Sequence, residues 1–192
     1  MSMEFKGVIF KCEEAIDRGL FQKLPEDLQD FYESINGLLA YNGGLQIRSC
    51  TDSGSWHSLA RFWTGELALH KTYPNLLESD IPFAQDCVGD QYFMREDGVW
   101  LLSAETGECM DMEVDLDEFF ESAIEDPVEY LAMEPLVHLL DRDGGLPIGE
   151  LVHVVPGLSL DLPEDTPYHI ESLPVAERIL WLKGFFQEHH QS

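Results

Sequence analysis

Basic residues are scarce in this chain, whose 192 residues include 11 Lys and Arg against 37 Asp and Glu, for a formal net charge of −26. Between Arg95 and Arg142 there is no Lys or Arg, and the same stretch carries 15 carboxylates. Proteins that bind nucleic acid neutralise phosphates with clustered Lys and Arg, and the sequence contains no such cluster. We therefore expect no direct nucleic-acid partner.

The charge imbalance is concentrated in the second half of the chain. Residues 1–95 hold 14 acids and 8 bases, whereas residues 96–192 hold 23 acids and 3 bases. Such an excess opposes compaction, but it favours solubility and steers a basic partner to the surface at rates that fall with salt. The charge pattern therefore predicts a positively charged partner.

Membrane-spanning and secretory features are also missing. No run of 18 apolar residues is present to cross a bilayer. The short apolar stretch at residues 7–10 is followed at once by Lys11, Glu13 and Glu14, which is not the pattern of a signal peptide. We expect a cytoplasmic protein that does not enter a membrane.

The four cysteines form no Cys-x-x-Cys pair and lie far apart in the sequence. They are Cys12, Cys50, Cys87 and Cys109. This spacing predicts free thiols in a reducing compartment. Disorder is excluded by the hydrophobic content of 44% and by 11 Phe, 6 Tyr and 4 Trp, which are enough to build a core.

Apolar residues at helical spacing predict five helices. Their ranges are 11–21, 25–35, 116–124, 127–133 and 173–188. The second begins at Pro25, which the first helical turn tolerates, and ends at Asn36-Gly37. The fourth follows Asp126, which we expect to cap it, with Glu129 reaching back to complete a capping box.

Alternating or short apolar runs between turn residues predict the strands. Their ranges are 45–48, 58–62, 81–84, 90–95, 99–103, 109–114 and 151–155. Most are joined by tight turns, which makes neighbouring strands antiparallel. Helices, then strands, then helices indicate an α+β fold with a mostly antiparallel sheet of about four to six strands, covered on one face by the N-terminal and C-terminal helices. We expect one domain over residues 1–135, with residues 136–192 as an extension whose final helix packs on it.

Residues 111–122 match a calcium-binding loop only in part. Asp111, Glu113, Asp115 and Asp117 alternate as in the first half of such a loop. The sixth position is Leu116 instead of glycine, and the twelfth is Ser122 instead of a bidentate glutamate. We expect no specific calcium site.

Other catalytic patterns are equally incomplete. No Cys/His set has zinc-binding spacing, and no Gly-rich loop with a lysine is present to hold phosphate. His57 lies beside Ser55 and Ser58, but sequence neighbours do not define a catalytic triad and there is no Gly-x-Ser-x-Gly turn. We therefore expect no catalytic residue, metal or cofactor, and keep a hydrolase or metal-dependent enzyme as an alternative of a different class.

Several short motifs occur along the chain in a characteristic order. They are Leu24-Pro25-Glu26-Asp27-Leu28 leading to Phe31-Tyr32 and Asn36-Gly37, then Ile81-Pro82-Phe83-Ala84 with Asp86, and Gly89-Asp90-Gln91-Tyr92-Phe93. In this order they resemble the SUKH (Smi/Knr-like) superfamily, over roughly residues 20–135. The acidic, Phe-rich stretch at 115–124 is similar to the family's closing segment, and residues 150–156 resemble a segment of long bacterial members.

The resemblance implies a compact α+β domain that binds protein and has no catalytic residues. Many bacterial members are immunity proteins that neutralise a toxin, often a nuclease, and a fungal branch regulates cell-wall assembly. We therefore expect an immunity protein that binds a basic toxin domain, with a regulatory or scaffold protein without a toxin partner as the alternative.

The partner-binding residues are expected where acids are densest and no base is near in the sequence. For the electrostatic contribution these are Asp111, Glu113, Asp115, Asp117, Glu118 and Glu121. Trp56, in a loop-like stretch beside Gly54, is the candidate apolar anchor, because Trp is enriched in binding hot spots.

Overall fold

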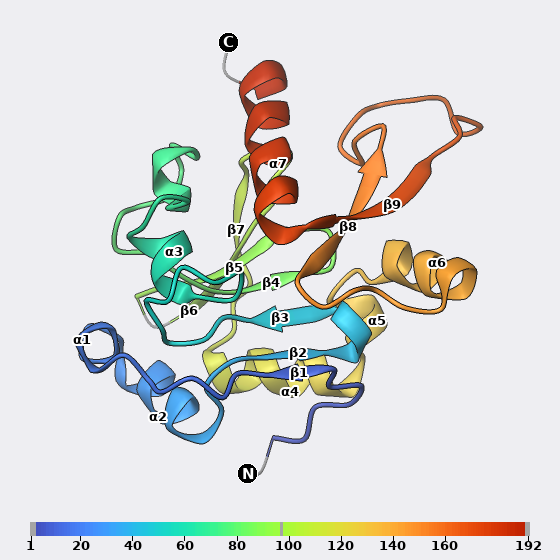
Figure 1. Ribbon diagram of the computed structural model, residues 1–192. Helices are drawn as coiled ribbons and strands as arrows, with labels where there is room; N and C mark the ends of the chain where they lie inside the picture. Colours follow the sequence, from blue (N-terminus) through green and yellow to red (C-terminus); the bar gives the residue numbers. More distant parts are fainter. Residues whose placement is uncertain (1–2, 97, 191–192) are drawn as a thin grey trace.

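A seven-stranded antiparallel sheet forms the centre of the protein (Figure 1). The computed structural model describes residues 3–96 and 98–190. The strands of this sheet lie in chain order: β1 (Phe10–Lys11), β2 (Leu38–Ala40), β3 (Leu45–Ile47), β4 (Ile81–Asp86), β5 (Gln91–Arg95), β6 (Gly98–Leu102) and β7 (Cys109–Asp111). A separate antiparallel pair is formed by β8 (Glu150–Val155) and β9 (His169–Pro174). The predicted α+β class with an antiparallel sheet is confirmed.

The helices are short except for the last. They are α1 (Arg18–Phe21), α2 (Glu26–Ser34), α3 (Leu59–Trp63), α4 (Leu116–Glu125), α5 (Pro127–Tyr130), α6 (Glu134–Asp143) and α7 (Val175–His190), with 3-10 turns η1 (Tyr41–Gly43) and η2 (Leu69–Lys71). None of the helices in the described ranges has the length and apolar character needed to cross a lipid bilayer.

Helices cover both faces of the sheet. Successive strand residues point to opposite faces of a sheet, so the side chains of Tyr92 and Phe93 on β5 pack against different layers of helices. The Tyr92 ring lies 4.8 Å from that of Phe119 on α4. Phe93 belongs to the core cluster that contains Ile179 and Leu182 of α7. Figure 1 accordingly shows α4 and α7 on opposite sides of the sheet, so the expectation of one covered face was wrong.

A β-bulge in β4 shapes the centre of the sheet. Ile81 pairs with Met94 and Ala84 with Tyr92, so β4 has one more residue than β5 over this interval. The bulge contains Pro82, which has no N–H to donate to the ladder. The fully buried Arg48 donates from Nη1 to the Pro82 carbonyl over 2.6 Å.

Two predicted elements differ from the structure. Residues 59–63 form α3 instead of a strand, because a short apolar run buried on all sides has no period that separates helix from strand. In the range predicted as the first helix, residue 11 ends β1 and the helix begins only at Arg18. Asp17 caps it, its Oδ1 accepting from the Leu20 N–H over 2.8 Å.

Several elements have no counterpart among the predictions. The strands β1 and β2 span two and three residues, too few to show a period, and form through pairing with their neighbours. The strand β9, none of whose residues is buried, forms through pairing with β8. Helix α6 lies where no helix was expected, although Pro135 in its first turn and Gly144 in the left-handed conformation after its end are typical helix boundaries.

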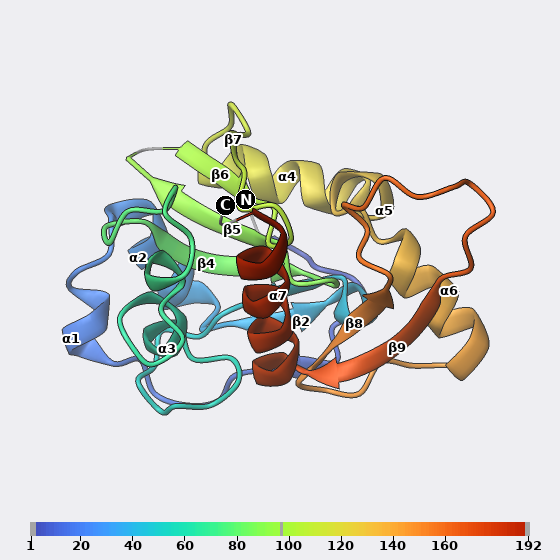
Figure 2. The ribbon, with the colours of Figure 1, turned by 90° about the horizontal axis from the view of Figure 1, so that it is seen from above.

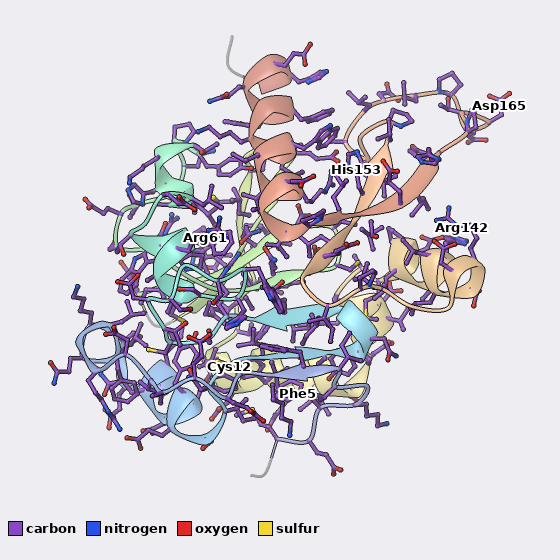
Figure 3. The ribbon with its side chains drawn as sticks, in the orientation of Figure 1. Phe5, Cys12, Arg61, Arg142, His153 and Asp165 are labelled. Atoms are coloured by element: carbon purple, nitrogen blue, oxygen red, sulfur yellow. The ribbon has the colours of Figure 1, made fainter. Side chains whose placement is uncertain are left out.

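Residues 136–190 are joined to the rest of the protein through buried contacts. The β8–β9 hairpin lies beside α6, as Figure 2 shows. Arg178 of α7 donates from Nε to the Val88 carbonyl over 3.0 Å, and its Nη1 lies 2.8 Å from Nδ1 of His153 on β8. Nη2 of Arg178 is 3.7 Å from Oε1 of Glu105, which lies in a turn and is buried. Figure 3 shows His153 facing α7.

Candidate functional site

The six acids expected to bind a partner lie between the end of β7 and the middle of α4, and all six are exposed. Three of them stabilise their own backbone. Asp111 Oδ1 accepts from the Glu113 N–H over 2.9 Å. Asp115 Oδ1 accepts from the Glu118 N–H over 2.9 Å, and Glu118 Oε2 accepts from the Asp115 N–H over 3.2 Å, which forms a capping box. A turn and a helix start therefore present these carboxylates to solvent.

The expected capping box at the next helix is only half formed. Asp126 Oδ1 accepts from the Glu129 N–H over 3.3 Å. The Asp126 N–H donates to the Ser122 carbonyl over 3.1 Å and so closes α4. Because that donor is occupied, Glu129 is not needed to satisfy it.

Helix α4 separates its polar and apolar sides. It buries Leu116, Phe119, Phe120 and Ala123. Asp117, Glu118 and Glu121 face solvent. Within residues 3–96 and 98–190, no Lys, Arg or His side-chain nitrogen lies within 4.0 Å of a carboxylate oxygen of the six predicted acids. Their charges are therefore uncompensated by direct ion pairs.

A hollow of about 630 Å³ lies between α2 and the start of α4. Four carboxylates line it, from Asp27 and Asp30 on α2 and from Asp115 and Asp117. The two helices are held together beneath it by Phe31 and Phe120, whose rings stack at 4.7 Å.

Asp27 and Asp30 were not among the predicted site residues. Their position on the polar side of an amphipathic helix is readable from the sequence, but the packing of α2 beside α4 is a tertiary contact. We use the name acidic face for the combined set Asp27, Asp30, Asp111, Glu113, Asp115, Asp117, Glu118 and Glu121.

Two lysines border the acidic face, although no Lys or Arg lies near its six predicted acids in the sequence. Lys11 lines the hollow between α2 and α4. Lys6 lines a second hollow of about 690 Å³, together with Asp117 and Glu121. Both lysines come from the N-terminal segment, which the fold places beside α4. They reduce the local negative potential without pairing directly with the predicted acids.

Trp56 lines neither hollow. Its ring is half-buried, with its centroid 5.0 Å from that of Phe10 and 4.9 Å from that of His57. A Cβ placed on Gly149 would lie 3.3 Å from its Nε1. The structure therefore brings the six predicted acids together and packs Trp56 into a different neighbourhood.

A third cavity of about 450 Å³ lies between α6 and the β8–β9 hairpin. Its lining includes His138, Arg142, Leu158 and Tyr168. Figure 3 shows Arg142 at this end of α6. The Arg142 guanidinium already makes two bonds to Asp143 and one to the Ile170 carbonyl. Since the guanidinium of Arg142 is already paired with Asp143, it is not available to bind an anionic ligand in this cavity.

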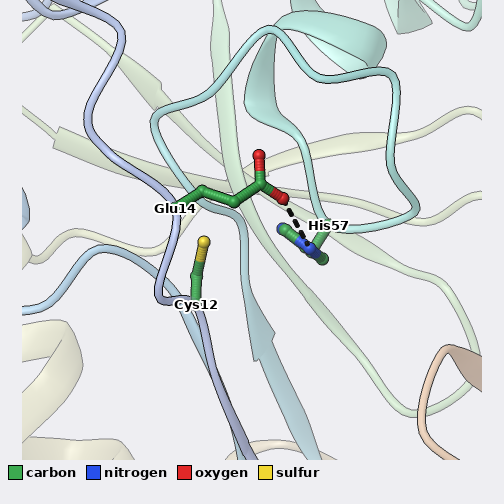
Figure 4. Close-up of side chains that lie close together, drawn as sticks. All are labelled: Cys12, Glu14 and His57. Atoms are coloured by element: carbon green, nitrogen blue, oxygen red, sulfur yellow. Dashed lines mark ion pairs between the residues drawn. The ribbon is translucent and has the colours of Figure 1, made fainter.

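Cys12, Glu14 and His57 form the one mixed cluster of metal-ligating type within the described residues (Figure 4). Their donor atoms all lie within 4.8 Å of one another. His57 is buried, and burial lowers the pKa of its imidazole, an effect that Glu14 opposes. This cluster could not be predicted from the sequence, because 43 positions separate Glu14 from His57 and the three residues do not follow a metal-binding spacing.

No family model, curated protein or solved structure matches this chain. The features of this chain that bear on its function are therefore the acidic face, the cluster of Cys12, Glu14 and His57, and the order of the motifs in the sequence.

Proposed function

We propose that this chain is a non-catalytic protein-binding domain whose acidic face binds a basic protein. The observation that carries the proposal is the meeting of α2 and α4 around one hollow, with carboxylates of both helices on its walls. A concave surface lined by charges of one sign focuses the electrostatic field and raises the local concentration of oppositely charged partners.

The form of the hollow indicates how a partner would be held. Phe31, Ile35 and Leu116 contribute apolar surface to it, and Asp27, Asp30, Asp115 and Asp117 surround them. A lysine or arginine side chain suits such a site, because its aliphatic stem covers apolar atoms while its head reaches the carboxylates. Steering by the wider acidic face would increase the rate of encounter, and buried contacts in the hollow would slow dissociation.

The resemblance to the SUKH superfamily supports a more specific form of this proposal. In that form the partner is a basic toxin domain, such as a nuclease, and the chain is its immunity protein. A nuclease presents Lys and Arg side chains that bind phosphate, and an acidic protein surface can bind the same side chains. The alternative is a regulatory protein of the same superfamily whose basic partner is not a toxin.

The test neutralises four acids of the face that hold no capping bond, as Asp27→Asn, Asp30→Asn, Asp117→Asn and Glu121→Gln. The partner is captured from the source cells with the unaltered chain, identified by mass and purified. We expect the variant to bind it about tenfold more weakly or worse, with a flatter dependence of Kd on salt, because fewer charges contribute to attraction.

A matched control changes the same number of exposed acids elsewhere, as Asp161→Asn, Glu164→Gln, Asp165→Asn and Glu188→Gln. It alters the net charge equally but leaves the hollow intact, so we expect binding close to that of the unaltered chain. An equal loss in both variants would assign the effect to net charge alone and reject the acidic face as the interface. Recovery of a toxin domain would support the immunity function, and a basic protein of another kind would support the regulatory alternative.

A further inference from the structure

Three side chains with sulfur, oxygen and nitrogen donors meet beside the edge strand β1 (Figure 4). Cys12 and Glu14 follow β1 directly, and His57 comes from the loop that leads into α3. We infer that Cys12, Glu14 and His57 form a binding site for one zinc-like divalent transition-metal ion, with a fourth coordination position open to solvent.

Hydrogen bonds fix the backbone of the two N-terminal ligands. The Cys12 N–H donates to the Gly37 carbonyl over 3.1 Å. Asn36 Nδ2 donates to the Glu14 carbonyl over 2.9 Å, and Asn36 Oδ1 accepts from the Cys50 N–H over 2.8 Å. One asparagine thus ties the segment that carries Cys12 and Glu14 to the segment that leads to His57. Ligands held in this way need little ordering when a metal binds.

Ser49 orients the imidazole of His57. Its Oγ lies 2.6 Å from Nδ1 of His57, and it also donates to the His57 carbonyl over 3.1 Å. A serine hydroxyl has a single proton. When that proton goes to the carbonyl, Oγ accepts from Nδ1–H, and the lone pair of the neutral ring is on Nε2. A second hydrogen bond of this kind on the far nitrogen is typical of metal-binding histidines.

The spacing of the donors suits a metal ion better than a direct contact. Nε2 of His57 lies 3.6 Å from Oε1 of Glu14, which is too long for a hydrogen bond. In tetrahedral zinc sites nitrogen and oxygen ligands lie about 2.0–2.2 Å from the metal, so two of them are roughly 3.3–3.6 Å apart. The His57 and Glu14 atoms already have this separation.

The donor set and its exposure indicate the class of metal. Thiolate, imidazole and carboxylate together favour zinc and similar transition metals over magnesium or calcium, which prefer oxygen alone. The side chain of His57 is 8% exposed and that of Glu14 is 45% exposed, so the site is closed on the histidine side and open on the glutamate side. Three protein ligands with one open position are the arrangement of zinc sites that also bind water or a further donor.

The experiment uses Co²⁺ as the probe on the full chain, after treatment with chelator and under reducing conditions. A cysteine ligand gives a thiolate-to-cobalt charge-transfer band, and tetrahedral coordination gives intense visible absorption. We expect one equivalent of Co²⁺ to produce both, Zn²⁺ to displace it, Cys12→Ser to abolish the thiolate band, and Glu14→Gln to weaken binding about tenfold or more.

The chain supplies a close control for each substitution. Cys109→Ser removes another half-buried thiol, and Glu13→Gln removes the exposed carboxylate next to Glu14. Both controls should keep the spectrum and affinity of the unaltered chain. A thiolate band that survives Cys12→Ser would overturn the inference, as would equal weakening by Glu13→Gln and Glu14→Gln or the absence of any thiolate band. Thermal unfolding of each variant without metal checks that a lost site is not a lost fold.

Discussion

Asp86 and Asp90 lie close together at the turn between β4 and β5, where solvent is largely excluded. Asp86 Oδ1 accepts from the N–H groups of Val88, Gly89 and Asp90 at 2.9 to 3.0 Å. Asp90 Oδ1 accepts from the Ala104 N–H over 2.8 Å. Burial raises the pKa of both carboxyls, and that of Asp90 rises to about 6. The two carboxylates therefore satisfy buried backbone N–H groups, but the burial of their charges is electrostatically unfavourable.

Replacing Asp90 with Asn should stabilise the protein at neutral pH. The amide oxygen can still accept from the Ala104 N–H, and no charge has to be buried. In the unaltered chain the folded-state pKa of about 6 lies above the unfolded value, so the penalty is absent below about pH 4 and complete above about pH 6. The gain in the free energy of unfolding from Asp90→Asn should therefore grow across this window. Its upper bound is about 3 kcal/mol, and solvent screening of the partly exposed side chain lowers it further.

Urea unfolding of the two proteins from pH 4 to pH 8 measures this difference directly. Taking the difference removes the contribution of the other carboxylates, apart from Asp86, whose pKa Asp90 also raises. Asp161→Asn, at an exposed position, should give no comparable trend. A difference that stays constant with pH would show that Asp90 carries no shifted pKa.

At the scale of single elements, the start of α4 performs two roles with one residue. Asp115 caps the helix, and it also lines the hollow of the acidic face. The capping bond needs only a side-chain oxygen at the right position, whereas attraction of a basic partner needs the charge. The two roles can therefore be separated by substitution.

Asp115→Ala and Asp115→Ser should affect stability differently and binding alike. Alanine cannot accept from the Glu118 N–H, so we expect a loss of about 1 kcal/mol in the free energy of unfolding. Serine retains an acceptor, so we expect a change of only a few tenths of that amount. Both lose the charge and should weaken partner binding to a similar degree. Urea titrations and binding assays on the pair measure this, and equal instability would contradict the capping role.

The elements that could be predicted from the sequence are those whose pattern is local. Helices α2 and α4 and the meander from β4 to β7 have clear periods and turn residues, and they lie within a few residues of their predicted positions. The strands β1, β2 and β9 exist because a neighbour supplies hydrogen-bond partners, which no local pattern encodes. The helix α3 was wrongly predicted as a strand because all but one of its five residues are buried.

The candidate sites also differ in whether their residues are brought together by local structure or by tertiary contacts. The exposure of the six predicted acids follows from a turn and an amphipathic helix, both local features. The contribution of Asp27 and Asp30 depends on the packing of two helices, and the cluster at Cys12 depends on a loop that returns to the edge strand. The burial of Glu105 is also a tertiary feature, because Glu105 lies in a turn and is covered by Arg178 of α7.

At the scale of the whole molecule, the uneven charge does not correspond to separate structural units. The second half of the sequence supplies most of the excess acid, yet its apolar residues enter both core clusters. Those after position 135 are Leu136, Leu139, Leu146, Val152 and Val154 in one cluster, and Leu151, Val175, Ile179, Leu182 and Phe186 in the other. The sheet is thus covered partly by the part of the chain that follows residue 135.

We expect a fragment of residues 1–135 to fail to fold cooperatively. The fragment would lack the ten apolar side chains named above, so the parts of the core that pack against them would be exposed to water. The fragment would also open the core cluster that Phe93 and Leu102 share with α7, and it would leave the Val88 carbonyl without its hydrogen bond from Arg178. Urea unfolding followed by near-ultraviolet circular dichroism should show no sharp transition for 1–135, whereas a chain of residues 1–190 should unfold like the full protein. A single steep transition in the fragment would show instead that the first 135 residues form an autonomous domain and that the remainder is an accessory layer.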